Sequence, residues 1–123
     1  MHLALAGPVP HRPEHGQVLS FDVPSADPEL VASGGRLLVD VEAGRHALYA
    51  LAQGDFPEGG PEGTSALPDT GQLLVADRDG GFDVVAAGLD RPTSMELADG
   101  NAYVVTYDGE VWRVGDLPGC RHR

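Results

Sequence analysis

The chain repeats itself at a nearly constant spacing, and this repeat constrains the fold more than any other feature. Segment 16–22 resembles segment 71–77. Further along the chain, and at almost the same offset, Glu42 aligns with Glu96 and Tyr49 aligns with Tyr103. Self-similarity at a fixed period marks a repeat architecture, in which each unit buries its apolar surface against its neighbours.

A third copy begins at segment 109–114, and it follows the second start at Gly71 more closely than Gly71 follows the first start. We therefore infer a unit of about 38 to 40 residues, with an insertion in the first copy. The units contain short runs rich in Val, Leu and Tyr, which suit strands, separated by Gly, Pro or Asp. No window shows a helical period. Four strands in about 40 residues match one blade of a β-propeller.

The predicted fold is therefore all-β: a partial β-propeller of about two four-stranded antiparallel blades plus one closing strand. At 123 residues, the chain is too short to close a propeller ring by itself. The predicted parts are a disordered segment 1–15, blade 1 at 16–53, an acidic Gly/Pro-rich insertion loop at 54–70, blade 2 at 71–108, the closing strand of a third blade at 109–117, and a tail at 118–123.

One stretch, residues 81–94, resembles a blade of the ScyD/ScyE family. These are predicted bacterial propellers related to NHL-repeat and gluconolactonase-like proteins. The runs 38–42, 60–71, 102–106 and 109–114 resemble the C-terminal part of such proteins. The resemblance implies a secreted, extracellular propeller of undefined activity, of which this chain would be a fragment.

The charge balance limits the classes of partner. With 8 Lys and Arg residues against 19 Asp and Glu residues, the formal net charge is −11. Such an acidic surface repels phosphate backbones and anionic lipids, so we expect neither a nucleic acid nor a membrane as partner. The apolar start of the chain is short and lacks a preceding Lys or Arg, so it is not a convincing signal peptide. The single cysteine, Cys120, excludes an intrachain disulfide.

Glu42 and Glu96 are the candidate metal ligands. They align with each other in the repeat and so occupy equivalent strand positions in the two units. The resemblance implies that this strand lines a central channel, where gluconolactonase-like relatives use carboxylates to hold a metal. Two carboxylates there could bind Ca²⁺, which prefers oxygen ligands; the alternative is a purely structural role. The run 77–80 mimics the opening of a calcium loop but lacks its later ligands, so we predict an ordinary hairpin turn.

Two further features have open interpretations. The insertion carries Asp55, Glu58, Glu62 and Asp69 and is predicted to be either a mobile rim loop or a partner-binding loop or lid. Trp112 is predicted to pack in the core rather than to form an exposed stacking platform.

The sequence contains no Gly-x-Ser-x-Gly elbow and no Cys/His pair with zinc spacing. The first functional hypothesis is therefore a non-catalytic binding or scaffold module for an unknown protein or small-molecule ligand. The alternative is a calcium-assisted, lactonase-like hydrolase. The incomplete ring predicts either a fragment of a longer propeller or a homo-oligomer that completes the ring.

Overall fold

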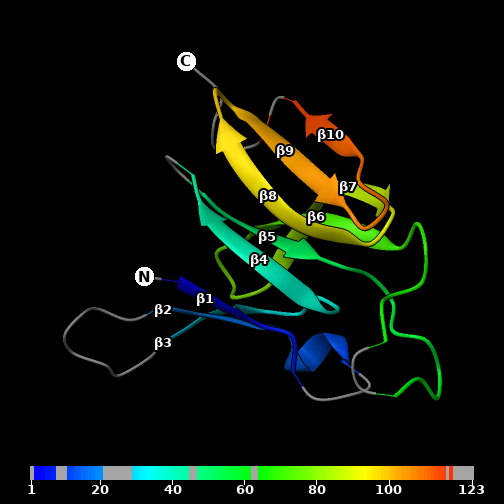
Figure 1. The fold of residues 1–123 in the computed structure, drawn as a ribbon. Coiled ribbons are helices and arrows are strands. Elements are labelled where there is room, and N and C mark those ends of the chain that lie inside the picture. The colour runs from blue at the N-terminus through cyan, green and yellow to red at the C-terminus, as the bar shows by residue number, and fades with distance from the viewer. Residues whose placement is uncertain are drawn as a thin grey trace.

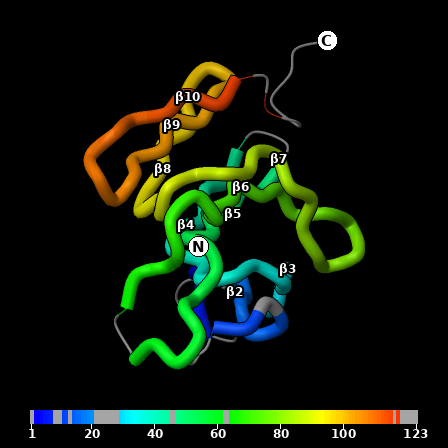
Figure 2. The backbone as a smooth tube through the Cα atoms, turned by 90° about the vertical axis from the view of Figure 1, so that its right-hand side faces the viewer, coloured from blue at the N-terminus to red at the C-terminus, as the bar shows by residue number. Residues whose placement is uncertain are grey.

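The computed structural model describes residues 2–7, 11–20, 29–44, 47–61, 64–115 and 117. These residues form three antiparallel sheets of three, four and three strands, so the all-β prediction is confirmed. Figures 1 and 2 show the sheets as three successive layers, with the first sheet at one end and the last at the other. No helix in the described part of the chain has the length and apolar character needed to span a membrane.

In each sheet, strands that are consecutive in the sequence pair with each other. The N-terminal sheet contains β1 (His2–Leu5), β2 (Gln17–Ser20) and β3 (Glu29–Ser33), and a short 3-10 helix, η1 (Pro13–His15), precedes β2. The central sheet contains β4 (Leu38–Ala43), β5 (Leu48–Ala52), β6 (Gly71–Ala76) and β7 (Phe82–Leu89). The C-terminal sheet contains β8 (Pro92–Ala98), β9 (Asn101–Thr106) and β10 (Val111–Val114).

The sheet boundaries differ from the predicted blade boundaries. The unit 16–53 contributes β2 and β3 to the N-terminal sheet but β4 and β5 to the central sheet. The unit 71–108 is divided in the same way between the central and C-terminal sheets. The prediction that each unit forms one four-stranded sheet is therefore wrong. The physical reason is that β5 pairs with β6 across the insertion, whereas the shorter links β3–β4 and β7–β8 pass from one sheet to the next.

The strand registers nevertheless match the sequence repeat. Tyr49 of β5 lies opposite Val75 of β6, and Tyr103 of β9 lies opposite Arg113 of β10. The β4–β5 ladder shifts register between Leu38 and Asp40, and the β8–β9 ladder shifts at the equivalent place. The equivalent strands are therefore β1, β5 and β9; β2, β6 and β10; β3 and β7; and β4 and β8.

This equivalence defines what each outer sheet lacks. Within the described ranges, the N-terminal sheet has no strand equivalent to β4, and the C-terminal sheet has none equivalent to β7. The central sheet is the one that contains all four positions.

The prediction of a disordered segment at 1–15 is wrong for the residues that the structure describes there. Residues His2–Leu5 pair in antiparallel register with Gln17–Ser20, and Ala4 packs against the apolar layer between the N-terminal and central sheets. The strand ladder and this apolar contact order the segment. Residues 8–10, Glu62 and the tail 118–123 with Cys120 lie outside the described residues.

Two apolar layers hold the three sheets together. The layer between the central and C-terminal sheets includes Tyr49, Leu51, Leu73, Met95 and Val104. The layer between the N-terminal and central sheets is formed by a second set of buried side chains: Val18, Leu38, Ala50, Ala52 and Leu74. Alternate residues of β5 belong to the two layers, so this strand is buried on both of its faces.

We expect Leu73→Ala to destabilise the fold by about 3 kcal/mol, because Leu73 is fully buried and its removal leaves a cavity. The matched control is Val111→Ala at the equivalent position of β10, where the side chain is 65% exposed; its cost should be within about 0.5 kcal/mol. Urea unfolding measures both. Equal costs for the two variants would contradict the exposed position of Val111.

Candidate functional site

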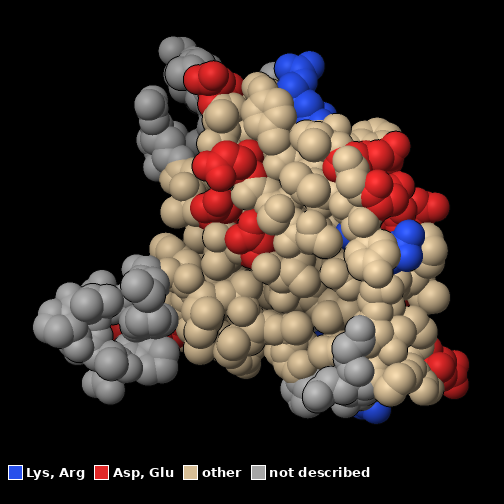
Figure 3. Space-filling view, viewed as in Figure 1, with Lys and Arg blue, Asp and Glu red and all other residues tan. Residues whose placement is uncertain are grey.

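The two predicted metal ligands lie on neighbouring strands of different sheets. Glu42 of β4 lies opposite Tyr49, and Glu96 of β8 lies opposite Tyr103. Strands β4 and β8 contact each other, which brings the two glutamates to the same seam between the central and C-terminal sheets. Acidic side chains gather over this seam in Figure 3. The seam is therefore the first candidate site.

A third carboxylate, Asp40, belongs to the same group. Burial raises the pKa of Glu42 above its ordinary value, and the neighbouring charges of Asp40 and Glu96 raise this pKa further. Ionised Glu42 is therefore repelled by both Asp40 and Glu96.

Asp40 already has a structural role at this seam. Its Oδ2 accepts a hydrogen bond of 2.9 Å from the backbone N–H of Met95 in the neighbouring sheet. Its Oδ1 accepts another of 2.8 Å from the N–H of Val41. Sequence reasoning missed Asp40, although it marks a difference between the copies: the equivalent residue on β8 is Ser94.

The seam provides only part of a calcium site. Ca²⁺ takes roughly six to eight oxygen ligands, and Glu42 and Glu96 supply two carboxylates. No group of three or more His, Cys, Asp or Glu side chains in the described ranges is arranged to hold a metal ion. Calcium binding by these two glutamates therefore stays a prediction, and it would need further oxygen ligands.

The calcium-loop mimic at 77–80 is a hairpin turn between β6 and β7, as predicted. Asp77 Oδ1 accepts hydrogen bonds from the N–H groups of Asp79 and Gly81, at 2.8 and 2.9 Å. The carboxylate therefore stabilises the turn itself.

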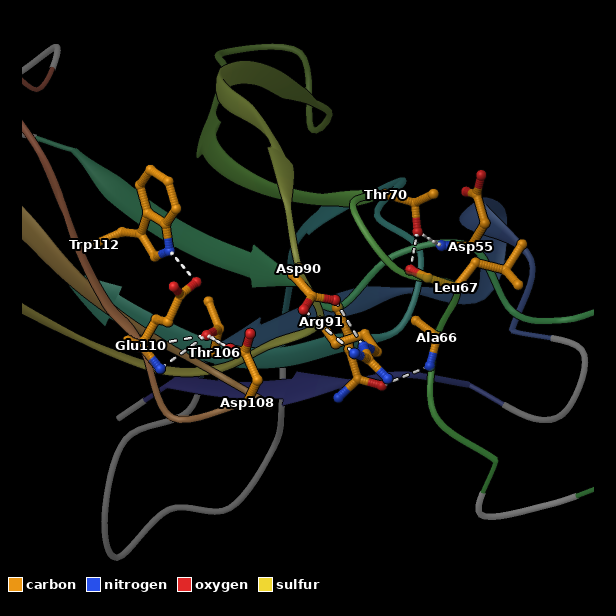
Figure 4. A network of polar contacts seen from close by, with 11 residues as sticks. Asp55, Ala66, Leu67, Thr70, Asp90, Arg91, Thr106, Asp108, Glu110 and Trp112 are labelled. Carbon is orange, nitrogen blue, oxygen red and sulfur yellow. Dashed lines mark hydrogen bonds and ion pairs between the residues drawn. The ribbon is translucent and has the colours of Figure 1, made fainter.

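The insertion is anchored to the body of the protein. Phe56 and Ala66 are buried in a small apolar cluster with Leu37. Figure 4 shows the hydroxyl of Thr70 joining the two ends of the loop: it accepts from the N–H of Asp55 at 2.9 Å and donates to the carbonyl of Leu67 at 2.8 Å. The described part of the loop thus has a defined conformation.

A polar cavity of about 390 Å³ lies where this loop meets the sheets. Arg36 and Asp55 both line it and form an ion pair, with 3.6 Å between Nε and Oδ1, and both side chains are about half exposed. The remaining polar side chains of its lining are Asp69, Thr70 and Gln72. Asp55 and Asp69 were predicted members of the acidic loop, whereas sequence reasoning missed Arg36 and Gln72. Among these predicted acidic residues, Glu58 is exposed and does not line the cavity.

The prediction that Trp112 packs in the core is wrong. Its side chain is 51% exposed, and its Nε1 donates a hydrogen bond of 3.4 Å to Glu110 Oε1 (Figure 4). The equivalent residue of β6, Leu74, is 3% exposed. The difference arises because β7 covers the outer edge of β6, whereas no strand in the described part of the chain covers that edge of β10.

The hairpin that carries Trp112 is well fixed. Thr106 is buried, and its hydroxyl contacts the carboxylate of Asp108 and accepts from the N–H of Glu110 at 3.2 Å. These contacts hold the start of β10 against the end of β9 (Figure 4). The outer edge of β10 is the second candidate site, because it carries exposed apolar side chains and no strand of the described ranges pairs with it.

No family model, curated protein or solved structure matches the chain. The function of the chain is therefore inferred from the geometry of the seam, the cavity and the edge of β10.

We expect Glu42→Gln to stabilise the protein by about 0.5 kcal/mol at pH 7, a small value because the seam is partly screened by solvent. The folded-state pKa of Glu42 is raised, so its contribution to stability is present below the ordinary pKa of 4.5 and is lost as the pH rises through the folded-state value. The gain from the substitution should therefore vanish near pH 4. Thermal unfolding at both pH values measures it, with exposed Glu58→Gln as the control. An equal gain at pH 4 would contradict the electrostatic cause.

Proposed function

We propose that this chain is a non-catalytic binding or scaffold module of the ScyD/ScyE type, built as part of a β-propeller. Support comes from three sheets that stack face to face and repeat the same strand registers, as successive propeller blades do. The extracellular location that we propose for it rests on the family resemblance alone.

The observation that carries the proposal is an uncovered apolar face on the C-terminal sheet. In the central sheet, Tyr49, Leu51 and Leu73 are fully buried against the C-terminal sheet. The next sheet carries Tyr103, Val105 and Val111 at the equivalent positions, and these side chains are 37%, 37% and 65% exposed. A face with the pattern of an interior layer but without a neighbour in the described structure is a docking surface.

The N-terminal sheet presents the complementary face. Leu3 and Leu5 of β1 are equivalent to Ala50 and Ala52 of β5, which pack against the N-terminal sheet. Leu3 is 46% exposed and Leu5 is 36% exposed. The module therefore has two apolar ends. Further blades can cover them, whether these blades belong to a longer protein or to another copy of the chain.

The alternative function is a calcium-assisted, lactonase-like hydrolase. The observation that favours it is the meeting of Glu42 and Glu96 at the seam. A bound cation would relieve the repulsion between these carboxylates and could polarise an ester carbonyl.

Calcium distinguishes the two functions. For a non-catalytic module we expect no binding of calcium in calorimetry and no rise in Tm when calcium is added. A rise in the Tm of the wild type that is lost in Glu96→Gln would favour the hydrolase. Magnesium serves as the control cation because it demands a smaller and more regular coordination shell.

We expect Val105→Lys to abolish association through the C-terminal face, because it places a charge at the centre of the apolar patch. The matched control is Val84→Lys on β7, a valine that is 55% exposed outside this face. Light scattering over a concentration series measures self-association. Wild type and variant are also immobilised and exposed to the same cell extract, and the proteins that each one binds are compared. Each protein found in this way is then purified and tested again for binding. The proposal would be contradicted if the wild type stays monomeric and binds no partner that the Val105→Lys variant fails to bind.

A further inference from the structure

The outer edge of β10 lacks the strand that its equivalents have. Strand β2 pairs with β3, and β6 pairs with β7, in each case on the side away from β1 or β5. Strand β10 pairs with β9, and no other strand in the described ranges pairs with it. Its outward backbone N–H and C=O groups are therefore available to an added strand.

The space beside the start of β10 is also open. Gly71 is the first residue of β6. A Cβ added to it would lie 2.3 Å from Pro92 Cδ and 2.8 Å from the carbonyl oxygen of Leu89. The chain that leaves β7 passes this glycine closely. At the equivalent Gly109, an added Cβ would meet nothing within 4 Å. An added Cβ at Gly109 thus meets open space, whereas one at Gly71 meets the chain that leaves β7.

The two strands that occupy this position elsewhere share a side-chain pattern. Each contains, in this order, an acidic residue, an aliphatic residue, a valine, an alanine and a small residue. In β3 these residues are Glu29, Leu30, Val31, Ala32 and Ser33, and in β7 they are Asp83, Val84, Val85, Ala86 and Ala87. In both ladders the valine falls at the register shift. Two copies therefore define the pattern and its register.

The register predicts what each residue of an added strand would face on β10. The acidic residue lies opposite Ser20 of β2 and Val75 of β6. The equivalent residue of β10 is Arg113, which is exposed and makes no ion pair with any residue that the structure describes. The aliphatic residue would lie opposite the half-exposed Trp112. At this position β2 and β6 carry a neutral residue, and the strands that pair with them, β3 and β7, carry an anion opposite it. Strand β10 carries a cation there instead.

We propose that the outer edge of β10 binds an extended segment of a partner protein with the pattern acidic–aliphatic–Val–Ala–small, which adds as an antiparallel fourth strand. This inference rests on the proposed binding function and names its ligand. A second copy does not suit the position, because its β3 and β7 are already paired within their own sheets.

The probe is a synthetic peptide with the sequence of residues 81–90, which carries the pattern. Trp112 is the only tryptophan of the 123-residue chain, so its fluorescence reports binding at β10. We expect a saturable fluorescence change. A peptide with Lys in place of Asp83, the acidic residue of the pattern, should bind about fivefold more weakly. The variant Arg113→Glu should reverse this preference, which a loss of folding could not produce.

The control peptide carries N-methyl groups at alternate backbone positions, which remove the donors of the strand ladder, and it should not bind. Absence of binding in fluorescence and in calorimetry, or binding that ignores the exchange of charges, would overturn the proposal. A concentration-dependent Trp112 signal without peptide, abolished by Arg113→Glu, would identify a second copy as the occupant and overturn the assignment to a partner. A further outcome is that the peptide fails to bind while Val105→Lys still weakens association. This result would overturn strand addition at β10 but would leave the proposed binding function standing.

Discussion

The stacking of apolar sheet faces is the constraint on which the rest of this structure depends. A narrow antiparallel sheet cannot bury both of its own faces, and here β5 carries apolar residues on both. Leu51 is fully buried in one layer and Ala50 in the other. Burial of one leucine stabilises by about 1.5–3 kcal/mol, and a hydrogen bond to a charged group contributes about as much, but each layer buries several apolar side chains. The layers therefore outweigh the polar link between Asp40 and Met95, which serves mainly to fix how the two sheets align.

The links between sheets determine which faces meet. Leu37 and Arg91 occupy equivalent places in the β3–β4 and β7–β8 links, and both have positive φ, at 51° and 44°. The carbonyl of each accepts a hydrogen bond from an equivalent amide, that of Gln53 at 2.8 Å and that of Tyr107 at 3.0 Å. Left-handed backbone is unfavourable for such residues, so its recurrence in both links indicates a requirement of the sheet-to-sheet turn. The same link conformation directs each sheet onto the next.

The sequence repeat predicts the strands and their registers well, because equivalent residues occupy equivalent ladder positions. The pairs Glu42 with Glu96 and Tyr49 with Tyr103 both hold. The repeat does not predict where one sheet ends, since a periodic sequence has no intrinsic origin. The boundary is set by pairing between β5 and β6 across the insertion, and no local signal in the sequence announces a contact over that distance.

Other features escape sequence reasoning because they depend on a neighbour. Fewer residues separate β1 from its equivalent β5 than separate β5 from β9. The reason is that the connection after β1 is shorter than the insertion after β5. The spacing of the main repeat therefore does not reveal β1. Asp40 resembles an ordinary strand residue until the amide of Met95 lies beside it. Trp112 has the composition of a core residue, and its exposure follows from a strand that is missing at its edge in the described structure.

The charges of β10 have two physical explanations, which the repeat can separate. Edge strands often carry charged residues because these discourage unselective pairing with other edges. Protection of this kind often uses cations, Lys above all, so the positive charge alone does not separate the two explanations. Arg113, however, is a cation in a chain of net charge −11, and it stands opposite the position where both β3 and β7 carry a carboxylate. Long-range repulsion of an acidic strand by the rest of the chain is screened beyond about 10 Å, whereas a cross-strand pair acts at about 5 Å. The local attraction therefore governs pairing once the strands meet. The sign and the register of Arg113 together favour selection of one kind of strand over simple protection of the edge.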